Sequence, residues 1–178
     1  ALAARRSIRE FAPDALPLPL LSGLLWAACG RNRNDGGRTA PSALNAQEID
    51  VYMALPEGAY RYDAGSHALN RVAPVDLRRV TGYQDFVDEA PLDLVYVADH
   101  ARMRLVPVAD RERYASAAAG AIAQNVYLFA AAHGLAAVLR AWIVRDAIAD
   151  ALGLEHDQQV LFSQTVGLPA HPPKRLVS

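Results

Sequence analysis

The chain has 178 residues, of which 52% are hydrophobic, enough for one substantial buried core. Its 18 basic and 19 acidic side chains leave a formal net charge of -1, so no broad electrostatic field attracts nucleic acid or an anionic membrane. The single cysteine, Cys29, excludes an intramolecular disulfide and any cysteine-rich metal site. We therefore expect a single domain over residues 1–178, in which any anion-binding site is a local cluster.

The first quarter of the chain predicts a core helix followed by a long loop. Residues 1–11 read as the end of a short helix that runs into an extended segment. The apolar run from Pro19 to Cys29 predicts a helix, because proline suits a first helical turn and Gly30 supplies a stop. This run is too short and too interrupted to span a bilayer. Residues 31–47 are rich in Gly, Asn, Arg and Ser, which predicts a functional loop.

The middle of the chain predicts strands. Residues 48–55 alternate apolar and polar side chains, and residues 59–72 read as a hairpin that turns at Asp63 to Ser66. Residues 92–98 are rich in Leu, Val and Tyr and predict a central strand. Two short helical pieces are expected between the hairpin and this strand, at residues 73–82 and 84–90.

The last third predicts a long helix and a closing strand. The elements expected there are a helix at 111–133, a strand leading into a turn at 135–144, a short helix at 145–152 and a strand at 158–169. Gly134 and Gly153 follow the two helices and are expected to end them. Helices and strands mix without regular βαβ alternation, which favours an α+β fold over a doubly wound parallel sheet.

An arginine cluster opens the chain, with Arg5, Arg6, Ser7 and Arg9 within five positions. Guanidinium groups give planar, permanently charged, multiple donors, and a serine hydroxyl adds a neutral hydrogen bond to the same oxygens. The cluster therefore indicates a phosphate site, although charge alone fits a solvated basic terminus equally well.

A second basic pair, Lys174 and Arg175, follows a Pro-Pro break near the other end of the chain. The two basic groups would converge on one phosphate if the chain ends meet, as the ends of folded domains commonly do. The alternative is a solvated tail.

Polar hydrogen-bonding groups also gather in the loop before the first predicted strand, over residues 41–47. Such a run matches the mixed edge of a flavin ring, which offers N–H and C=O groups on one side and apolar surface on the other. A serine- or asparagine-capped turn explains the same residues. Trp142 is interpreted as a core residue, with a stacking platform as the open alternative.

Several common functional motifs are missing. The sequence contains no GxGxxG after a strand, no GxxxxGK[ST], no HExxH and no GxSxG, and its five histidines show no ligand spacing. We therefore expect no metal site and no hydrolase or dinucleotide-fold chemistry.

Four blocks in order resemble the nitroreductase superfamily along almost the whole chain. They are RRSIREF at 5–11, APSALNAQ at 40–47, AGAIAQNVYLFAAAHGLAAVL at 119–139 and ADALGLEHDQQVLFSQTVGLPA at 149–170. The hairpin GAYRYDAGSHALNRV at 58–72 looks like that of the SagB-type branch, which includes azoline oxidases. The chain departs from the family pattern at Gln47-Glu48-Ile49, where Gln-Pro-Trp or a His-Pro pair is usual.

The resemblance implies an α+β sandwich with a mixed, mainly antiparallel sheet flanked by helices, in an intertwined homodimer with FMN at the interface. Residue by residue, it implies that the opening motif grips the phosphate, ribityl and pyrimidine groups, that the 41–45 loop covers the partner's flavin, and that the basic tail completes the phosphate clamp. The implied cofactor-binding residues are Arg5, Arg6, Ser7, Arg9, Pro41, Ser42, Ala43, Asn45, Leu139, Arg140, Ala141, Lys174 and Arg175.

The activity implied is hydride transfer from NADH or NADPH through FMN to a small acceptor such as a nitroaromatic or quinone, with ping-pong kinetics and no catalytic side chain. Other readings stay open: a SagB-type dehydrogenase or oxidase acting on a specific, peptide-derived substrate, a flavin-binding protein without turnover, and a basic-ended interaction domain without flavin. We expect a cytoplasmic location, or a periplasmic one if an N-terminal signal has been removed.

Overall fold

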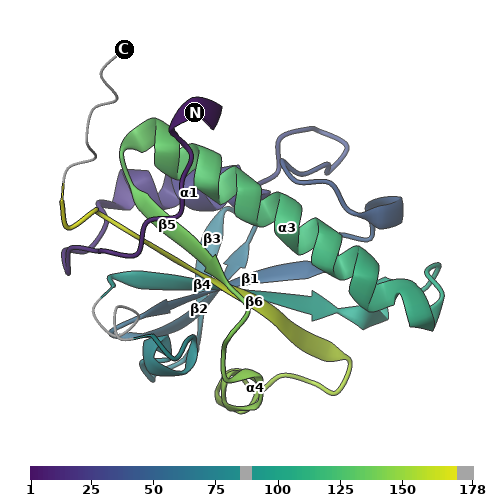
Figure 1. Cartoon of the computed structure of the whole chain (residues 1–178). Coiled ribbons are helices and arrows are strands. Elements are labelled where there is room, and N and C mark those ends of the chain that lie inside the picture. The colour runs from purple at the N-terminus through teal and green to yellow at the C-terminus, as the bar shows by residue number, and fades with distance from the viewer. Residues whose placement is uncertain (85–89, 172–178) are drawn as a thin grey trace.

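The computed structural model describes residues 1–84 and 90–171, and its centre is one six-stranded sheet (Figure 1). The strand order is β3-β2-β1-β4-β6-β5, and each of the five pairings is antiparallel. The strands are β1 (Ile49–Leu55), β2 (Gly58–Asp63), β3 (Ala68–Ala73), β4 (Leu92–Asp99), β5 (Ala136–Arg140) and β6 (Gln158–Gly167). The expected α+β fold with a mainly antiparallel sheet is confirmed.

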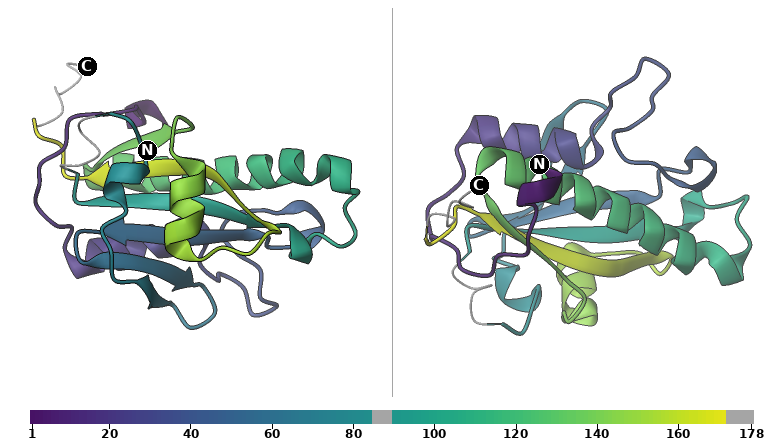
Figure 2. Two further views of the ribbon diagram at one scale, coloured as in Figure 1. Left: turned by 90° about the horizontal axis from the view of Figure 1, so that it is seen from below. Right: turned by 45° about the horizontal axis from the view of Figure 1, so that its top comes forward.

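Helices cover both faces of this sheet. The helices α1 (Leu18–Cys29) and α3 (Val108–His133) pack against each other on one face, and α4 (Arg145–Leu152) lies on the other (Figures 1 and 2). Short 3-10 turns are η1 (Leu2–Ala4), η2 (Ala43–Asn45), η3 (Arg78–Val80) and η4 (His100–Arg102). The sheet is therefore the middle layer of three.

The central strand β4 shows why both faces are apolar. Leu94 and Tyr96 belong to the core on the α1 and α3 side, whereas Val95 and Val97 belong to the core on the α4 side. Alternate side chains of a strand point to opposite faces, so a strand covered on both sides reads as a continuous hydrophobic run.

The helix α3 is long and apolar enough to cross a membrane by length and composition alone. Its buried stripe includes Ala119, Ile122 and Val126, which pack in the same core as α1 and the sheet. It therefore serves as a core helix of this domain. It ends as expected at Gly134, whose φ of +69° is readily adopted only by glycine.

Several predicted boundaries need correction. The helix α3 begins at Val108 rather than 111, and residues 73–82 form only the 3-10 turn η3. The segment predicted at 135–144 is a strand that leads into a turn, as expected, and its strand ends at Arg140. A proline occupies the N-cap position of both α1 and α3, and each helix begins slightly earlier than predicted. The helical piece predicted at 84–90 lies almost entirely outside the described residues.

The two ends of the chain meet at one edge of the sheet. In the N-terminal arm, defined as residues 5–12, the Ile8 amide donates to the Ala137 carbonyl at 3.0 Å. The Ala12 amide donates to Leu168 O at 2.9 Å, and the Ala170 amide returns to Glu10 O at 3.0 Å. The expected meeting of the chain ends is confirmed up to residue 171.

Candidate functional site

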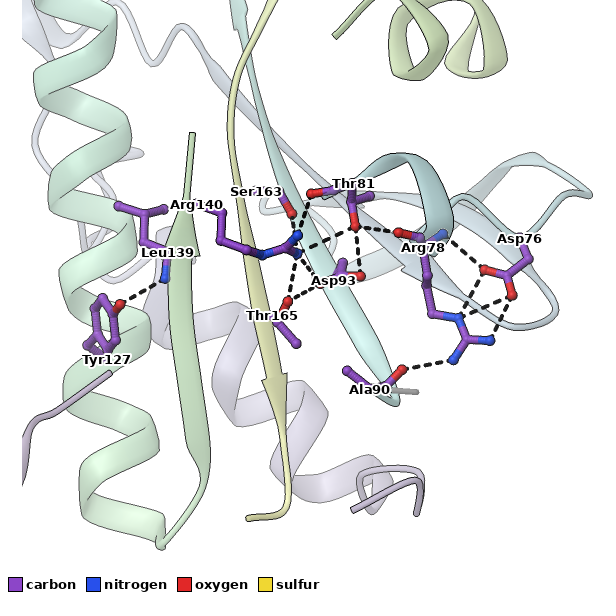
Figure 3. Close-up of polar contacts among 10 residues, drawn as sticks. All are labelled: Asp76, Arg78, Thr81, Ala90, Asp93, Tyr127, Leu139, Arg140, Ser163 and Thr165. Carbon is purple, nitrogen blue, oxygen red and sulfur yellow. Dashed lines mark hydrogen bonds and ion pairs between the residues drawn. The ribbon is translucent and has the colours of Figure 1, made fainter. Parts of the chain in front are cut away.

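Tyr127 of α3 joins the N-terminal arm to β5. Its hydroxyl lies 2.9 Å from Ser7 Oγ. The same hydroxyl accepts a hydrogen bond from the Leu139 amide at 2.8 Å (Figure 3). The Arg5 guanidinium lies over the Tyr127 ring, 5.2 Å from its centre, which is within cation–π range. Two of the predicted groups, the opening motif and the 139–141 segment, are thus brought together by a residue that the sequence analysis did not select.

The arginines of the arm keep their charge available. Arg6 and Arg9 are exposed and Arg5 is half-buried. Among the described residues, no ion pair joins any of the three to a carboxylate. The arm therefore presents three guanidinium groups and one hydroxyl along the edge where the chain ends meet, an arrangement suited to an anion such as phosphate.

The C-terminal half of the predicted clamp is only partly described. Residues 168–170 run beside residues 10–12, and His171 Nε2 lies 3.7 Å from Glu10 Oε2. Lys174 and Arg175 lie outside the described residues. Up to residue 171, the C-terminal segment lies alongside the N-terminal arm. The role of Lys174 and Arg175 stays a prediction.

The 41–47 loop is held in an unusual backbone shape. Leu44, Asn45 and Gln47 all have φ near +50°, a left-handed conformation that costs energy for residues other than glycine. Ser42 Oγ accepts the Gln47 amide at 2.9 Å, and Gln47 Nε2 donates to Asn45 Oδ1 at 3.1 Å. The local structure therefore agrees with the interpretation of these residues as a capped turn. In this turn Pro41 and Leu44 are exposed.

This loop lies far from the N-terminal arm within one chain. Pro41, Ser42 and Ala43 line a cavity of about 310 Å³ with Tyr114 and Ala118 of α3. With a helical rise of about 1.5 Å per residue, Tyr127 lies about 14 Å along α3 from Ala118. The loop and the Tyr127 contacts therefore lie at two separate positions along α3 within one subunit.

Arg140 turns to the opposite face of β5 and is buried (Figure 3). Its Nη2 donates to Asp93 Oδ1 at 2.7 Å, to Thr165 Oγ1 at 2.6 Å and to Ser163 Oγ at 3.0 Å. Its Nη1 donates to the Thr81 carbonyl at 2.6 Å. The side chain is therefore committed to a structural network, so that only the backbone of Arg140 remains to face a ligand.

Asp93 is the acid of this network and is fully buried. Burial is the largest influence and raises the pKa of its carboxyl group, while Arg140, Thr165 and Thr81 oppose that shift. Burial likewise lowers the pKa of Arg140 from its ordinary value, against the attraction of Asp93. Each charge is tolerated because the other is beside it, so we expect that removing one partner alone is costly.

Trp142 corrects the core interpretation. Its side chain is 71% exposed, and its ring lies 5.1 Å from that of Tyr83, which is 54% exposed. The strand ends at Arg140, two residues before Trp142, so Trp142 leaves the sheet instead of continuing into the core. Cys29, in contrast, is buried as expected, and burial raises the pKa of its thiol to about 12.

Comparisons with known proteins agree with this fold. The sequence profile of the Nitroreductase family matches residues 2–168. A protein of Methanocaldococcus jannaschii, provisionally named nitroreductase MJ1384, is 32% identical over 144 residues, which cover 75% of this chain and 73% of that protein. The chain belongs to the nitroreductase family.

Two solved structures show the likeness in three dimensions. The crystal structure of a protein from Ralstonia eutropha JMP134, provisionally described as a nitroreductase, is 52% identical with a TM-score of 0.91 over 96% of this chain and 81% of that chain. The NADPH:FMN oxidoreductase of Vibrio harveyi, complexed with NAD+, shares the fold at 21% identity and a TM-score of 0.71, over 97% of this chain and 68% of that one. The family places this chain among the flavin oxidoreductases.

Proposed function

We propose that this protein is a homodimeric, FMN-dependent oxidoreductase that takes electrons from NADH or NADPH and passes them to a small acceptor such as a nitroaromatic or a quinone. The observation that carries the proposal is the Tyr127 hydroxyl, which joins Ser7 of the arginine motif to the Leu139 amide of β5. A phosphate-binding group and a ring-lining group are thereby held side by side, as a flavin mononucleotide requires.

The phosphate end of FMN fits the N-terminal arm. Arg5, Arg6 and Ser7 would hold the phosphate and ribityl groups, because their donors are not engaged by carboxylates among the described residues. Lys174 and Arg175 would complete the clamp, since the chain enters the tail beside Glu10. This assignment makes the meeting of the chain ends a requirement for cofactor binding.

The ring end of FMN fits the segment that leaves β5. Leu139 is half-buried and Ala141 exposed, so both could contact a flat ring, while Arg140 would contribute only backbone groups. The 41–45 loop lies too far along α3 to reach the same ring, so Pro41, Ser42, Ala43 and Asn45 would come from the second copy of the chain. This separation supports a site shared between two subunits.

FMN, when bound, supplies reversible two-electron chemistry. The residues of this chain would bind it, orient it and adjust its electrostatics. Arg9 is exposed on the same arm as the phosphate group donors and would place a fixed positive charge at the pyrimidine edge, favouring negative charge there. No side chain is required to donate or accept a proton in this scheme.

The test is a visible absorption spectrum of the purified protein, recorded before and after anaerobic addition of NADH and then NADPH. We expect flavin bands that bleach with at least one nicotinamide. Bands that bleach with neither would favour a dedicated oxidase or a flavin-storage protein. A colourless protein that takes up no added FMN would contradict the proposal.

A further inference from the structure

Two aromatic rings stand in solvent directly beside the proposed ring site. Trp142 and Tyr83 are 71% and 54% exposed, their ring centres lie 5.1 Å apart and their planes are tilted by 35°. Trp142 follows Ala141 in the sequence and therefore adjoins the ring-lining segment 139–141. Two large aromatic side chains left in water keep their apolar faces uncovered, which points to a ligand that covers them.

The buried Arg140 network connects the backbone segments that carry the two rings. Arg140 precedes Trp142 by two residues, and its Nη1 donates to the carbonyl of Thr81, two residues before Tyr83 (Figure 3). A backbone hydrogen bond of 3.2 Å from Val144 to Val80 adds a second link. The segment that carries Tyr83 is thus hydrogen-bonded to the segment at the end of β5 that carries Trp142. The backbones that bear the two rings are therefore held in place relative to each other.

Two charged groups close in sequence to this ring pair are engaged elsewhere. Arg145 Nη2 donates to the carbonyls of Ala141 and Leu161, each at 3.0 Å. The carboxylate of Asp76 is bound by Arg78, with the shortest contact at 2.7 Å. Within the described residues, the pair itself presents two aromatic faces, which suit a flat ring.

We propose that Tyr83 and Trp142 form a platform that stacks the ring of a planar aromatic electron acceptor and determines which acceptors the enzyme uses. The inference rests on the proposed FMN function, because that function places the acceptor beside residues 139–141. Within it, the Tyr83–Trp142 platform selects acceptors by shape: fused planar rings bind better than acceptors without a planar face.

The kinetic test compares two acceptors in the Trp142→Ala and Tyr83→Ala variants. With saturating nicotinamide, each variant should raise the KM for 1,4-naphthoquinone about five- to tenfold through lost stacking. The KM for ferricyanide, which has no planar face, should change less than about twofold on the same reasoning. The kcat should stay near the wild-type value.

Matched controls separate stacking from general damage. Trp142→Phe keeps an aromatic face and should restore most of the naphthoquinone affinity. Val72→Ala removes an exposed apolar side chain on β3, at the sheet edge opposite β5, and should change neither KM. Equal changes for both acceptors in Trp142→Ala, or none for naphthoquinone, would overturn the platform.

A second readout does not depend on turnover. The chain has two tryptophans, so Trp26→Phe leaves Trp142 as the only indole emitter. Titrating 1,4-naphthoquinone into this variant should quench its fluorescence saturably, whereas Trp142→Phe, which keeps Trp26, should show only linear, collisional quenching. Linear quenching in both variants would contradict the platform. A lack of bound flavin would instead contradict the proposed function, and the titration would still decide whether the platform binds.

Discussion

The N-terminal arm and the end of β5 use arginine in opposite ways. Arg6 and Arg9 are exposed, and among the described residues neither they nor Arg5 pairs with a carboxylate. Arg140 is buried and donates to Asp93, Thr81, Ser163 and Thr165. The same guanidinium group is therefore available to a ligand in one region and committed to the fold in the other.

This difference shows that composition alone does not identify a binding arginine. A charge held in water with unfilled donors costs little in the absence of ligand and gains much from a phosphate. A charge in the core must have its partners already in place. Substituting the buried arginine and the exposed arginines in turn therefore tests this comparison directly.

The largest effect is expected from Arg140→Leu. The substitution leaves Asp93 buried without its counterion and should lower the free energy of unfolding by about 3–5 kcal/mol. Urea denaturation measures this change. The double variant Arg140→Leu/Asp93→Leu removes both charges and should recover part of the loss. A loss below about 1 kcal/mol in the single variant would mean that the network contributes little to the fold.

Next in size is the effect of Arg5→Ala/Arg6→Ala on FMN retention. Loss of two charge-assisted contacts should weaken FMN binding by about a hundredfold. The urea midpoint should fall only slightly, because Arg6 is exposed and Arg5 contributes one cation–π contact with the Tyr127 ring. Flavin fluorescence during titration with FMN measures the affinity. Arg113→Ala provides the charge control, since Arg113 is an exposed arginine of α3 that pairs with Asp110 and lies over the Tyr114 ring. Unchanged affinity in the double variant would remove the phosphate role.

A smaller effect is expected from Tyr127→Phe. Tyr127 is the residue that joins the N-terminal arm to β5. The variant deletes the acceptor of the Leu139 amide and the partner of Ser7, so it should lose about 1 kcal/mol of stability. FMN affinity should fall with it, because the arm is no longer fixed to β5. Hydrogen exchange of the Leu139 amide is the direct measurement, and unaltered protection would show that the hydroxyl does not hold the strand.

The smallest effect concerns Glu48, a buried acid whose carboxylate lacks the hydrogen-bond partners that Asp93 has. Neither carboxylate oxygen has a hydrogen-bond partner within the described part of the chain. Burial raises the pKa of Glu48 above its ordinary 4.5, and Arg102 and His100 only partly oppose this. The folded state therefore holds the proton more tightly than the unfolded state, so stability falls as pH rises from 4.5 through the folded pKa.

Glu48→Gln removes this dependence. The variant should be more stable than the wild type by about 1 kcal/mol at pH 8, and the difference should shrink toward pH 4. Thermal unfolding across that range measures it. A variant that is less stable at pH 8 would show that the carboxylate has a partner in solution, such as a bound water.

Much of the fold followed from the sequence because its signals are local. The glycines after α3 and α4, the hairpin turn at Asp63 to Ser66 and the apolar run of β4 each depend on neighbouring residues. The turn after β5 was predicted but the last residue of the strand was not, because the apolar run continues to Val144 while the chain leaves the sheet after Arg140. That boundary depends on a partner, Thr81, distant in sequence.

The site divides in the same way. The arginine motif and the 41–45 loop were visible as unusual composition. The structure shows Arg6 and Arg9 exposed and the loop closed by a hydrogen bond to Ser42, and the roles of both segments in cofactor binding stay predictions. Tyr127 was missed because an aromatic residue in an alanine-rich helix reads as core, and only its contacts with Ser7 and Leu139 reveal more. Trp142 was assigned to the core for a related reason, since its exposure depends on where the strand stops.

The pairing of residues 10–12 with residues 168–170 has a consequence for the order of assembly. These contacts join segments separated by most of the chain, so the loop-closure entropy must be overcome before they can form. During synthesis, the arm has no strand to dock against until β5 and β6 have emerged. The phosphate clamp is therefore expected to be among the last parts to form, and cofactor would be captured only by a chain whose sheet is already complete.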